Sequence, residues 1–308
     1  METHRKIIID TDIGDDIDDA FAILLAMMSE RFEILGITTV FRNSLQRGKI
    51  ARALVESAGK NIPVYIGADM PLGGQMPFFP FEKRDKTGKP GIPHYFPEME
   101  GKRTEEKSAE DFILDSAERF SGEVSIIALA PFTNLANARA KSPERFQKLR
   151  QILLMGGDVS FNFAEWNVRC DYVSAKSVFD CGVDSVVCGL DITSAAVLSE
   201  QDLARLRMLR SAPFRLLMKM TDKYIRDYCG MRRPTMHDPL ALCTYLLPEK
   251  FEFENRRLSV STEEFTKGKL REAGLEKKVV VKADVRAVIE YMIDTFSRYD
   301  EYLMEKSQ

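Results

Sequence analysis

Apolar runs that favour β-strands alternate with helical patterns along most of this chain of 308 residues. The runs expected to form strands are 6–9, 33–40, 63–66, 124–129, 151–155 and 184–190. Strands that alternate with helices favour a mainly parallel sheet, because each connection carries its helix onto one face of the sheet. The sequence therefore predicts an α/β fold in a single domain, 1–308, with a doubly wound, Rossmann-like sheet and helices on both faces.

Some regions depart from this alternation. Residues 67–106 contain many Gly and Pro residues, aromatic residues and His94, and a loop this long is expected to be a mobile active-site loop. Residues 199–236 are mostly helical, and Pro213 is expected to break the helix. Residues 251–283 suggest a small strand region that precedes a closing amphipathic helix. None of these regions reads as a linker between two domains.

Composition excludes several classes of function. The formal net charge of −3 argues against non-specific binding to nucleic acid. Hydrophobic residues make up 44% and charged residues 30% of the chain, as expected of a soluble globular protein. No apolar run approaches the roughly 18 residues of a membrane span. The N-terminus leads into a strand without the apolar core of a signal peptide, so a cytoplasmic location is expected.

Six aspartates lie within the ten residues 10–19, between the first expected strand and the first helix. The carboxyl end of a strand is where open α/β sheets bind their ligands. The dipole of the following helix can stabilise one or two of these charges, and a bound divalent cation would compensate the others. Oxygen ligands of this kind favour Ca²⁺ or Mg²⁺ over zinc or copper.

Three further segments follow expected strands or begin a helix, where they could meet the acidic residues. After the strand 124–129, a backbone carbonyl of Leu129 or Ala130 could coordinate a hard cation. After 151–155, the segment 156–167 offers two glycines, a glutamate and two asparagines that could hydrogen-bond several hydroxyl groups, although such residues are also common in solvated loops. The third segment is 237–239. A lone histidine is more often structural, but His237 beside an acidic residue could protonate a leaving group near neutral pH.

Together these residues resemble the inosine–uridine-preferring nucleoside hydrolase family. The matching segments occur in the family's order and are Asp10-Thr11-Asp12 with Asp18-Asp19-Ala20, Ile37-Thr38-Thr39-Val40 with Asn43, Thr133-Asn134-Leu135-Ala136, Leu154-Met155-Gly156-Gly157, Ala164-Glu165-Trp166-Asn167 and His237-Asp238-Pro239. The match extends from Ile7 to about Asp238. It implies a Ca²⁺-dependent enzyme that cleaves the N-glycosidic bond of ribonucleosides into ribose and free base, and it favours a homodimer or a homotetramer.

The resemblance also implies roles for single residues. The implied Ca²⁺ ligands are the carboxylates of Asp12, Asp19 and Asp238 and the backbone carbonyl of Leu129, with Asp12 also acting as the general base. The implied ribose ligands are Asp18, Asn43, Glu165 and Asn167, with Asn162 and Met155 lining the same pocket. His237 is a candidate general acid for the leaving base. Tyr224 and Tyr228 match positions on a helical region, 199–236, that covers the base.

The chain departs from the family's commonest pattern, Asp-x-Asp-Pro-Gly-x-Asp-Asp-Ala, within the aspartate cluster. Ile13 replaces the proline, and two extra residues precede the second acidic pair. Counted from Asp10, that pair falls on Asp16 and Ile17; counted back from Ala20, it falls on Asp18 and Asp19. The helix after Ala20 favours the second count, with Asp16 as a possible additional ligand.

Two other functions are compatible with the acidic cluster. One is a Mg²⁺-dependent phosphohydrolase that uses Asp10 as nucleophile and Asp12 as acid. Such an enzyme would need a well-placed lysine and a later acidic pair, and neither is clear in the sequence. The other is a non-catalytic protein that binds nucleosides or sugars with the help of Ca²⁺.

Overall fold

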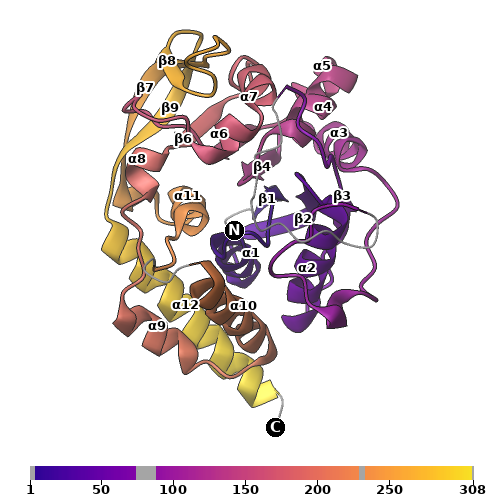
Figure 1. Cartoon of the computed structure of the whole chain (residues 1–308), viewed down its shortest axis with the longest axis vertical. Helices are drawn as coiled ribbons and strands as arrows, with labels where there is room; N and C mark the ends of the chain where they lie inside the picture. The colour runs from indigo at the N-terminus through magenta and orange to yellow at the C-terminus, as the bar shows by residue number, and fades with distance from the viewer. Residues whose placement is uncertain (1–3, 74–87, 229–232, 307–308) are drawn as a thin grey trace.

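The computed structural model describes residues 4–73, 88–228 and 233–306 of one mixed α/β domain (Figure 1). Its strands are β1 (Arg5–Thr11), β2 (Phe32–Thr39), β3 (Val64–Ile66), β4 (Val124–Ala128), β5 (Gln151–Met155), β6 (Ser185–Cys188), β7 (Phe251–Val260), β8 (Leu270–Glu272) and β9 (Leu275–Ala283). They form one nine-stranded sheet in the order β3-β2-β1-β4-β5-β6-β9-β7-β8. Neighbours are parallel from β3 to β9, whereas β7 pairs antiparallel with β9 and β8. The predicted α/β fold with a mainly parallel sheet is confirmed.

Helices cover both faces of this sheet. They are α1 (Asp18–Met28), α2 (Ser44–Ser57), α3 (Ala109–Arg119), α4 (Thr133–Lys141), α5 (Pro143–Phe146), α6 (Trp166–Cys170), α7 (Tyr172–Phe179), α8 (Leu190–Thr193), α9 (Glu200–Arg207), α10 (Ala212–Tyr228), α11 (His237–Leu246) and α12 (Val285–Lys306), with 3₁₀ turns η1 (Pro97–Met99) and η2 (Pro248–Lys250). Ile7 and Ile9 of β1 pack in one hydrophobic core and Ile8 in another, because successive strand side chains point to opposite faces. In the described part of the chain, no helix has the length and apolar character needed to cross a membrane.

The break expected at Pro213 is present: α9 ends at Arg207 and α10 begins at Ala212. Pro213 lies in the first turn of α10, where its missing N–H leaves no intrahelical bond unmade. After β5, Glu165 caps the short helix α6 by accepting backbone N–H bonds from Asn167 and Val168.

The segment 67–106 was expected to be a mobile active-site loop, and its residues 74–87 lie outside the described residues. The described parts on either side bond to the loops that follow β1 and β2. The N–H groups of Phe41 and Arg42 donate to the carbonyls of Ala68 and Asp69, both at 2.7 Å. Farther along, the N–H of His94 donates to the carbonyl of Gly14 at 3.1 Å. These bonds place one described end of the segment beside the turn 41–42 and the other beside Gly14, between β1 and α1.

Candidate active site

A cavity of about 340 Å³ lies at the carboxyl ends of β1, β4 and β5. The cavity is lined by Asp12, Asp15, Asp16, Asp18, Asp19, Leu129, Met155, Phe163, Ala164, Glu165, Trp166, Asn167, Leu190, His237 and Asp238. The order of the strands reverses between β1 and β4, since β2 lies on one side of β1 and β4 on the other. Such a switch point is where doubly wound sheets bind their ligands. The structure thus brings most of the site residues expected from the sequence to one place.

The acidic loop 12–17 connects β1 to α1 and is tied down at its far end. Asp18 and Asp19 form the first turn of α1, where the helix dipole favours negative charge. The hydroxyl group of Thr11 donates a hydrogen bond to the carboxylate of Asp19. The backbone N–H of Asp238, in the first turn of α11, donates to the carboxylate of Asp18 at 3.1 Å. Two segments 220 residues apart therefore close one wall of the cavity.

Carboxylate oxygens of Asp16, Asp18 and Asp19 all lie within 4.8 Å of one another. Burial raises the pKa of Asp18 to about 6, and the charge of Asp19 contributes. Burial, together with repulsion from neighbouring aspartates, raises the pKa of Asp19 and of Asp238 well above the ordinary range. A cation among these groups would remove both penalties. An all-oxygen set of donors fits a hard divalent ion such as Ca²⁺ or Mg²⁺.

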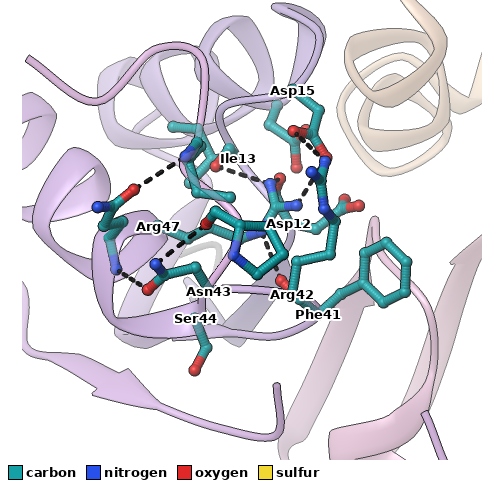
Figure 2. A network of polar contacts seen from close by, with 12 residues as sticks. Asp12, Ile13, Asp15, Phe41, Arg42, Asn43, Ser44 and Arg47 are labelled. Carbon is teal, nitrogen blue, oxygen red and sulfur yellow. Dashed lines mark hydrogen bonds and ion pairs between the residues drawn. The ribbon is translucent and has the colours of Figure 1, made fainter. Parts of the chain in front are cut away.

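Two arginines hold the acidic loop from the other side (Figure 2). Arg47 of α2 is fully buried and donates to the carbonyls of Phe41 at 2.8 Å and Ile13 at 3.1 Å, and also to the carbonyl of Asp12. Its other guanidinium nitrogen contacts the carboxylate of Asp15 at 2.7 Å, and Arg42 contacts the same carboxylate at 3.1 Å. Burial alone would raise the pKa of Asp15, but the two guanidinium groups outweigh it and lower that pKa.

The turn that carries Arg42 has an unusual backbone. Phe41 and Arg42 have φ angles of 74° and 65°, in the left-handed region that residues with side chains rarely adopt. Such strain persists only where the surrounding structure enforces it. The bond from Arg47 to the carbonyl of Phe41 and the bonds to residues 68 and 69 do so here.

This network bears on the two extra residues that the sequence carries before its second acidic pair. Asp15 is neutralised by the arginines, whereas Asp16 projects its carboxylate toward Asp18 and Asp19. The two extra acidic residues therefore lie in different surroundings. The sequence analysis did not predict the two arginines. Closely spaced aspartates that need compensating positive charge were, however, a reason to look for buried arginine or lysine side chains.

Substituting Arg47→Met is expected to destabilise the protein by about 3–5 kcal/mol, because it removes the buried donor of three backbone carbonyls and one of the two guanidinium partners of Asp15. Chemical denaturation with urea measures the free energy of unfolding. Arg52→Met, on the same helix, is the matched control: its pair with Glu56 is partly exposed and should contribute at most about 1 kcal/mol. Equal losses in the two variants would show that the buried network does not stabilise the acidic loop.

The opposite wall is built on the ends of β4 and β5. The Glu165 carboxylate accepts N–H bonds from Gly157 at 2.9 Å, from Asn167 at 2.9 Å and from Val168 at 3.1 Å. The side-chain amide of Asn167 donates to the carbonyls of Leu129 at 3.0 Å and Met155 at 3.1 Å. Both side chains are thus fixed in the cavity wall by their surroundings.

His237 lies where α11 begins, next to Asp238. Its Nδ1 atom is 2.8 Å from the hydroxyl oxygen of Thr193. Burial lowers the pKa of His237 to about 4, so the imidazole is neutral near pH 7.

Four residues expected at the site are placed elsewhere or are not described. Asn43 caps α2 and donates to the carbonyl of Pro90 at 3.1 Å. Asn162 is exposed and donates to the hydroxyl of Ser160 at 2.9 Å. Tyr224 of α10 meets the ring of His94 edge-on, with centroids 6.2 Å apart. Tyr228 ends α10, and its side chain lies outside the described residues. None of the first three lines the cavity as described, so their contacts with ribose and base stay predictions.

The sequence analysis did not predict two apolar residues of the cavity. Phe163 and Leu190 line it beside Trp166, and their apolar character gives no sequence signal for a site. His94 is fully buried, and neither ring nitrogen has a hydrogen-bond partner in the described structure. Burial lowers its pKa to about 4, although the charge of Asp15 opposes this.

Comparison with known proteins identifies the family. Residues 7–290 match the model of the inosine-uridine preferring nucleoside hydrolase family. Uridine nucleosidase 1 of Arabidopsis thaliana is 33% identical, over 94% of this chain and 92% of its own length. The pyrimidine-specific ribonucleoside hydrolase RihA of Shewanella woodyi is 30% identical, over 86% of each chain. A solved plant nucleoside hydrolase superposes with a TM-score of 0.83 at 26% identity, covering 96% of this chain and 99% of its own.

An α/β sheet with an acidic cavity at its switch point, together with these matches, defines a hydrolase of nucleosides. The chain belongs to the inosine-uridine preferring nucleoside hydrolase family.

Proposed function

We propose that this enzyme hydrolyses the N-glycosidic bond of ribonucleosides to ribose and free base, using Ca²⁺ and Asp12 as general base. The observation that carries the proposal is the convergence of the acidic loop, Asp238, His237 and the Glu165–Asn167 wall on one cavity. The names of the relatives from Arabidopsis thaliana and Shewanella woodyi support uridine and other pyrimidine ribonucleosides as the first substrates to test.

Ca²⁺ would be held by the carboxylates of Asp12, Asp19 and Asp238 and the carbonyl of Leu129. Asp16 is a further candidate, supported by the closeness of its carboxylate to those of Asp18 and Asp19. When bound, the ion supplies positive charge that keeps the carboxylates ionised and acidifies a water beside them. A carboxylate base remains useful, because Ca²⁺ acidifies water less than Zn²⁺ does.

Asp12 would take a proton from the attacking water. Without a cation, burial raises the pKa of its carboxyl to about 8, while the charge of Arg47 opposes this. A bound cation would keep the group ionised, so that it can accept the proton. As the glycosidic bond breaks, positive charge develops on the ribose, and the surrounding carboxylates stabilise it. Asp18, Glu165 and Asn167, which line the cavity beside Met155, would hold the ribose hydroxyls.

His237 would donate a hydrogen bond to the leaving base. Its lowered pKa makes the ring neutral, so it donates as an imidazole N–H rather than as an imidazolium. If the hydroxyl of Thr193 donates to Nδ1, the proton lies on Nε2, and that N–H is available to the base.

Two alternatives receive less support. A phosphohydrolase would need Asp10 as nucleophile. However, Asp10 is fully buried and accepts bonds from Thr38 at 2.6 Å and Asn134 at 2.7 Å, and it does not line the cavity as described. A Ca²⁺-dependent binding protein would hold nucleosides without turnover. Membership of a hydrolase family argues against that function.

The direct test is a panel of uridine, cytidine, inosine and guanosine incubated with the enzyme in Ca²⁺ buffer, with released base and ribose measured by chromatography. Release of base from at least one nucleoside is expected. A phosphate monoester is the control substrate. Phosphate release without base release would favour the phosphohydrolase, and binding without turnover would favour the binding protein.

Asp19→Asn is expected to weaken Ca²⁺ binding by at least roughly tenfold, and more than Asp16→Asn does, because Asp19 is the ligand when the acidic pair is counted back from α1. Isothermal titration with Ca²⁺ measures both affinities. Asp222→Asn, on the exposed surface of α10, is the control with the same loss of charge. A larger loss of Ca²⁺ affinity in Asp16→Asn than in Asp19→Asn would favour the count from Asp10, which places the acidic pair at Asp16 and Ile17.

The cytoplasmic location and the homodimer or homotetramer that the resemblance favours stay predictions.

A further inference from the structure

A second cavity, of about 740 Å³, lies at the amino end of β1, whereas the acidic loop follows the carboxyl end of that strand. Arg5, at the first residue of β1, lines it, whereas Asp12 follows the last residue of the same strand. Its walls come from the start of β1, the segment before β2, the end of α11 and the α12 helix. We call it the basal cavity, and its main side chains are Arg5, Arg31, Arg298, Tyr245, Tyr291 and Tyr299.

Among the described residues, the lining of the basal cavity carries more positive than negative charge. Its three arginines face a single acidic lining residue, Glu30. Within the described part of the chain, their hydrogen bonds go to neutral acceptors. Arg5 donates to the side-chain oxygen of Gln151 at 3.4 Å, Arg31 to the carbonyl of Leu246 at 2.8 Å and Arg298 to the hydroxyl of Thr295 at 3.3 Å. Three guanidinium groups in a hollow that has one acidic lining residue favour an anion from outside.

Aromatic rings line the same cavity. The guanidinium of Arg5 lies 4.0 Å above the ring centroid of Tyr245, and the hydroxyl of Tyr245 donates to Gln151 at 2.8 Å. Farther along α12, Tyr299 and Tyr302 lie with ring centroids 5.8 Å apart, and Tyr302 is 46% exposed. Phenol rings that are held in place and partly open to solvent offer faces on which a planar ring can stack.

We propose that the basal cavity binds a small phosphorylated compound that carries a planar ring, such as a nucleoside monophosphate. Arginine forks match phosphate oxygens bidentately, and the volume lies in the range of small-molecule sites. The two cavities have opposite charge: the acidic one repels a phosphate group, and the basal one attracts it. The proposal concerns a separate site and does not rest on the proposed hydrolysis.

Isothermal titration of the full-length protein with uridine 5′-monophosphate, ribose 5-phosphate, inorganic phosphate and uridine tests this. The monophosphate should bind more tightly than ribose 5-phosphate or inorganic phosphate, which lack the ring. Arg5→Gln and Arg298→Gln should each weaken its binding by about tenfold or more, because each removes a charged hydrogen-bond donor. Arg298 is exposed on α12, so its substitution should not impair folding. Arg52→Gln on α2 is the control and should leave the affinity unchanged.

Several outcomes would overturn the proposal. Equal affinity for the monophosphate and inorganic phosphate would remove the role of the ring. Unchanged binding in both arginine variants would place the anion elsewhere. A change of mass in sedimentation on Arg298→Gln, without phosphate binding to the parent protein, would instead make this face an interface between copies of the chain. Base release by Arg298→Gln should equal that of the parent, so a failure here is distinguishable from a failure of the hydrolase proposal.

Discussion

Asp12→Asn is expected to lower kcat for nucleoside hydrolysis by about 100- to 10,000-fold, the usual contribution of a general base. The asparagine keeps the size of the side chain but cannot accept the proton of the attacking water. Because Asp12 is also a proposed Ca²⁺ ligand, steady-state kinetics should be measured at a Ca²⁺ concentration that saturates the variant. Titration with the ion establishes that concentration.

The control for this substitution is Asp222→Asn, whose side chain is exposed and pairs with Arg207 at 2.9 Å. It should retain the parent's kcat. Turnover of Asp12→Asn near the parent's value at saturating Ca²⁺ would refute Asp12 as the base. Another carboxylate in the cavity would then have to take the proton.

Removal of divalent ions with a chelator is expected to abolish base release, and added Ca²⁺ is expected to restore it. The physical reason is repulsion between carboxylates, because carboxylate oxygens of Asp16, Asp18 and Asp19 lie within 4.8 Å of one another. Burial and this repulsion also raise the pKa values of Asp19 and Asp238. Without a cation, protonation of these groups would relieve the repulsion, and the water would lose its activation.

The same experiment has a second readout in thermal unfolding. A ligand that binds only the folded state stabilises it by about 2.7 kcal/mol at 100 times its dissociation constant, so Ca²⁺ should raise Tm. Restoration by Mg²⁺ but not by Ca²⁺ would correct the identity of the ion. Full activity in chelator would refute the metal requirement.

Much of the fold follows from local patterns in the sequence. The apolar run before the aspartates forms β1, and the alternation of strands with helices gives the parallel part of the sheet. The place of β7, β8 and β9 in that sheet did not follow. Which edge a strand joins depends on pairing between distant segments, as when Val186 of β6 lies beside Lys278 of β9. The residues themselves carry no mark of that neighbour.

The candidate site, like the fold, could be predicted from the sequence only in part. The positions of Asp12 and Asp19 beside Asp238 could be expected from motifs at strand ends and helix starts. The surroundings of Asp15 and Asp16 could not, because they depend on Arg47, which reaches the carbonyl of Asp12 from 35 residues away. Counting residues along the chain cannot register such a contact. His94 was assigned to a loop on composition, yet the structure buries its ring.

The bonds from Arg47 to the carbonyls of Asp12 and Ile13 have a consequence for the kinetics of metal exchange. They fix the backbone of the acidic loop through protein contacts alone, so the entropy of ordering that loop is lost when the chain folds. An arriving cation then meets carboxylates that are already gathered, and its entry rate should be set by dehydration of the ion rather than by closure of the loop. We therefore expect the backbone of the acidic loop to keep its shape when a cation binds.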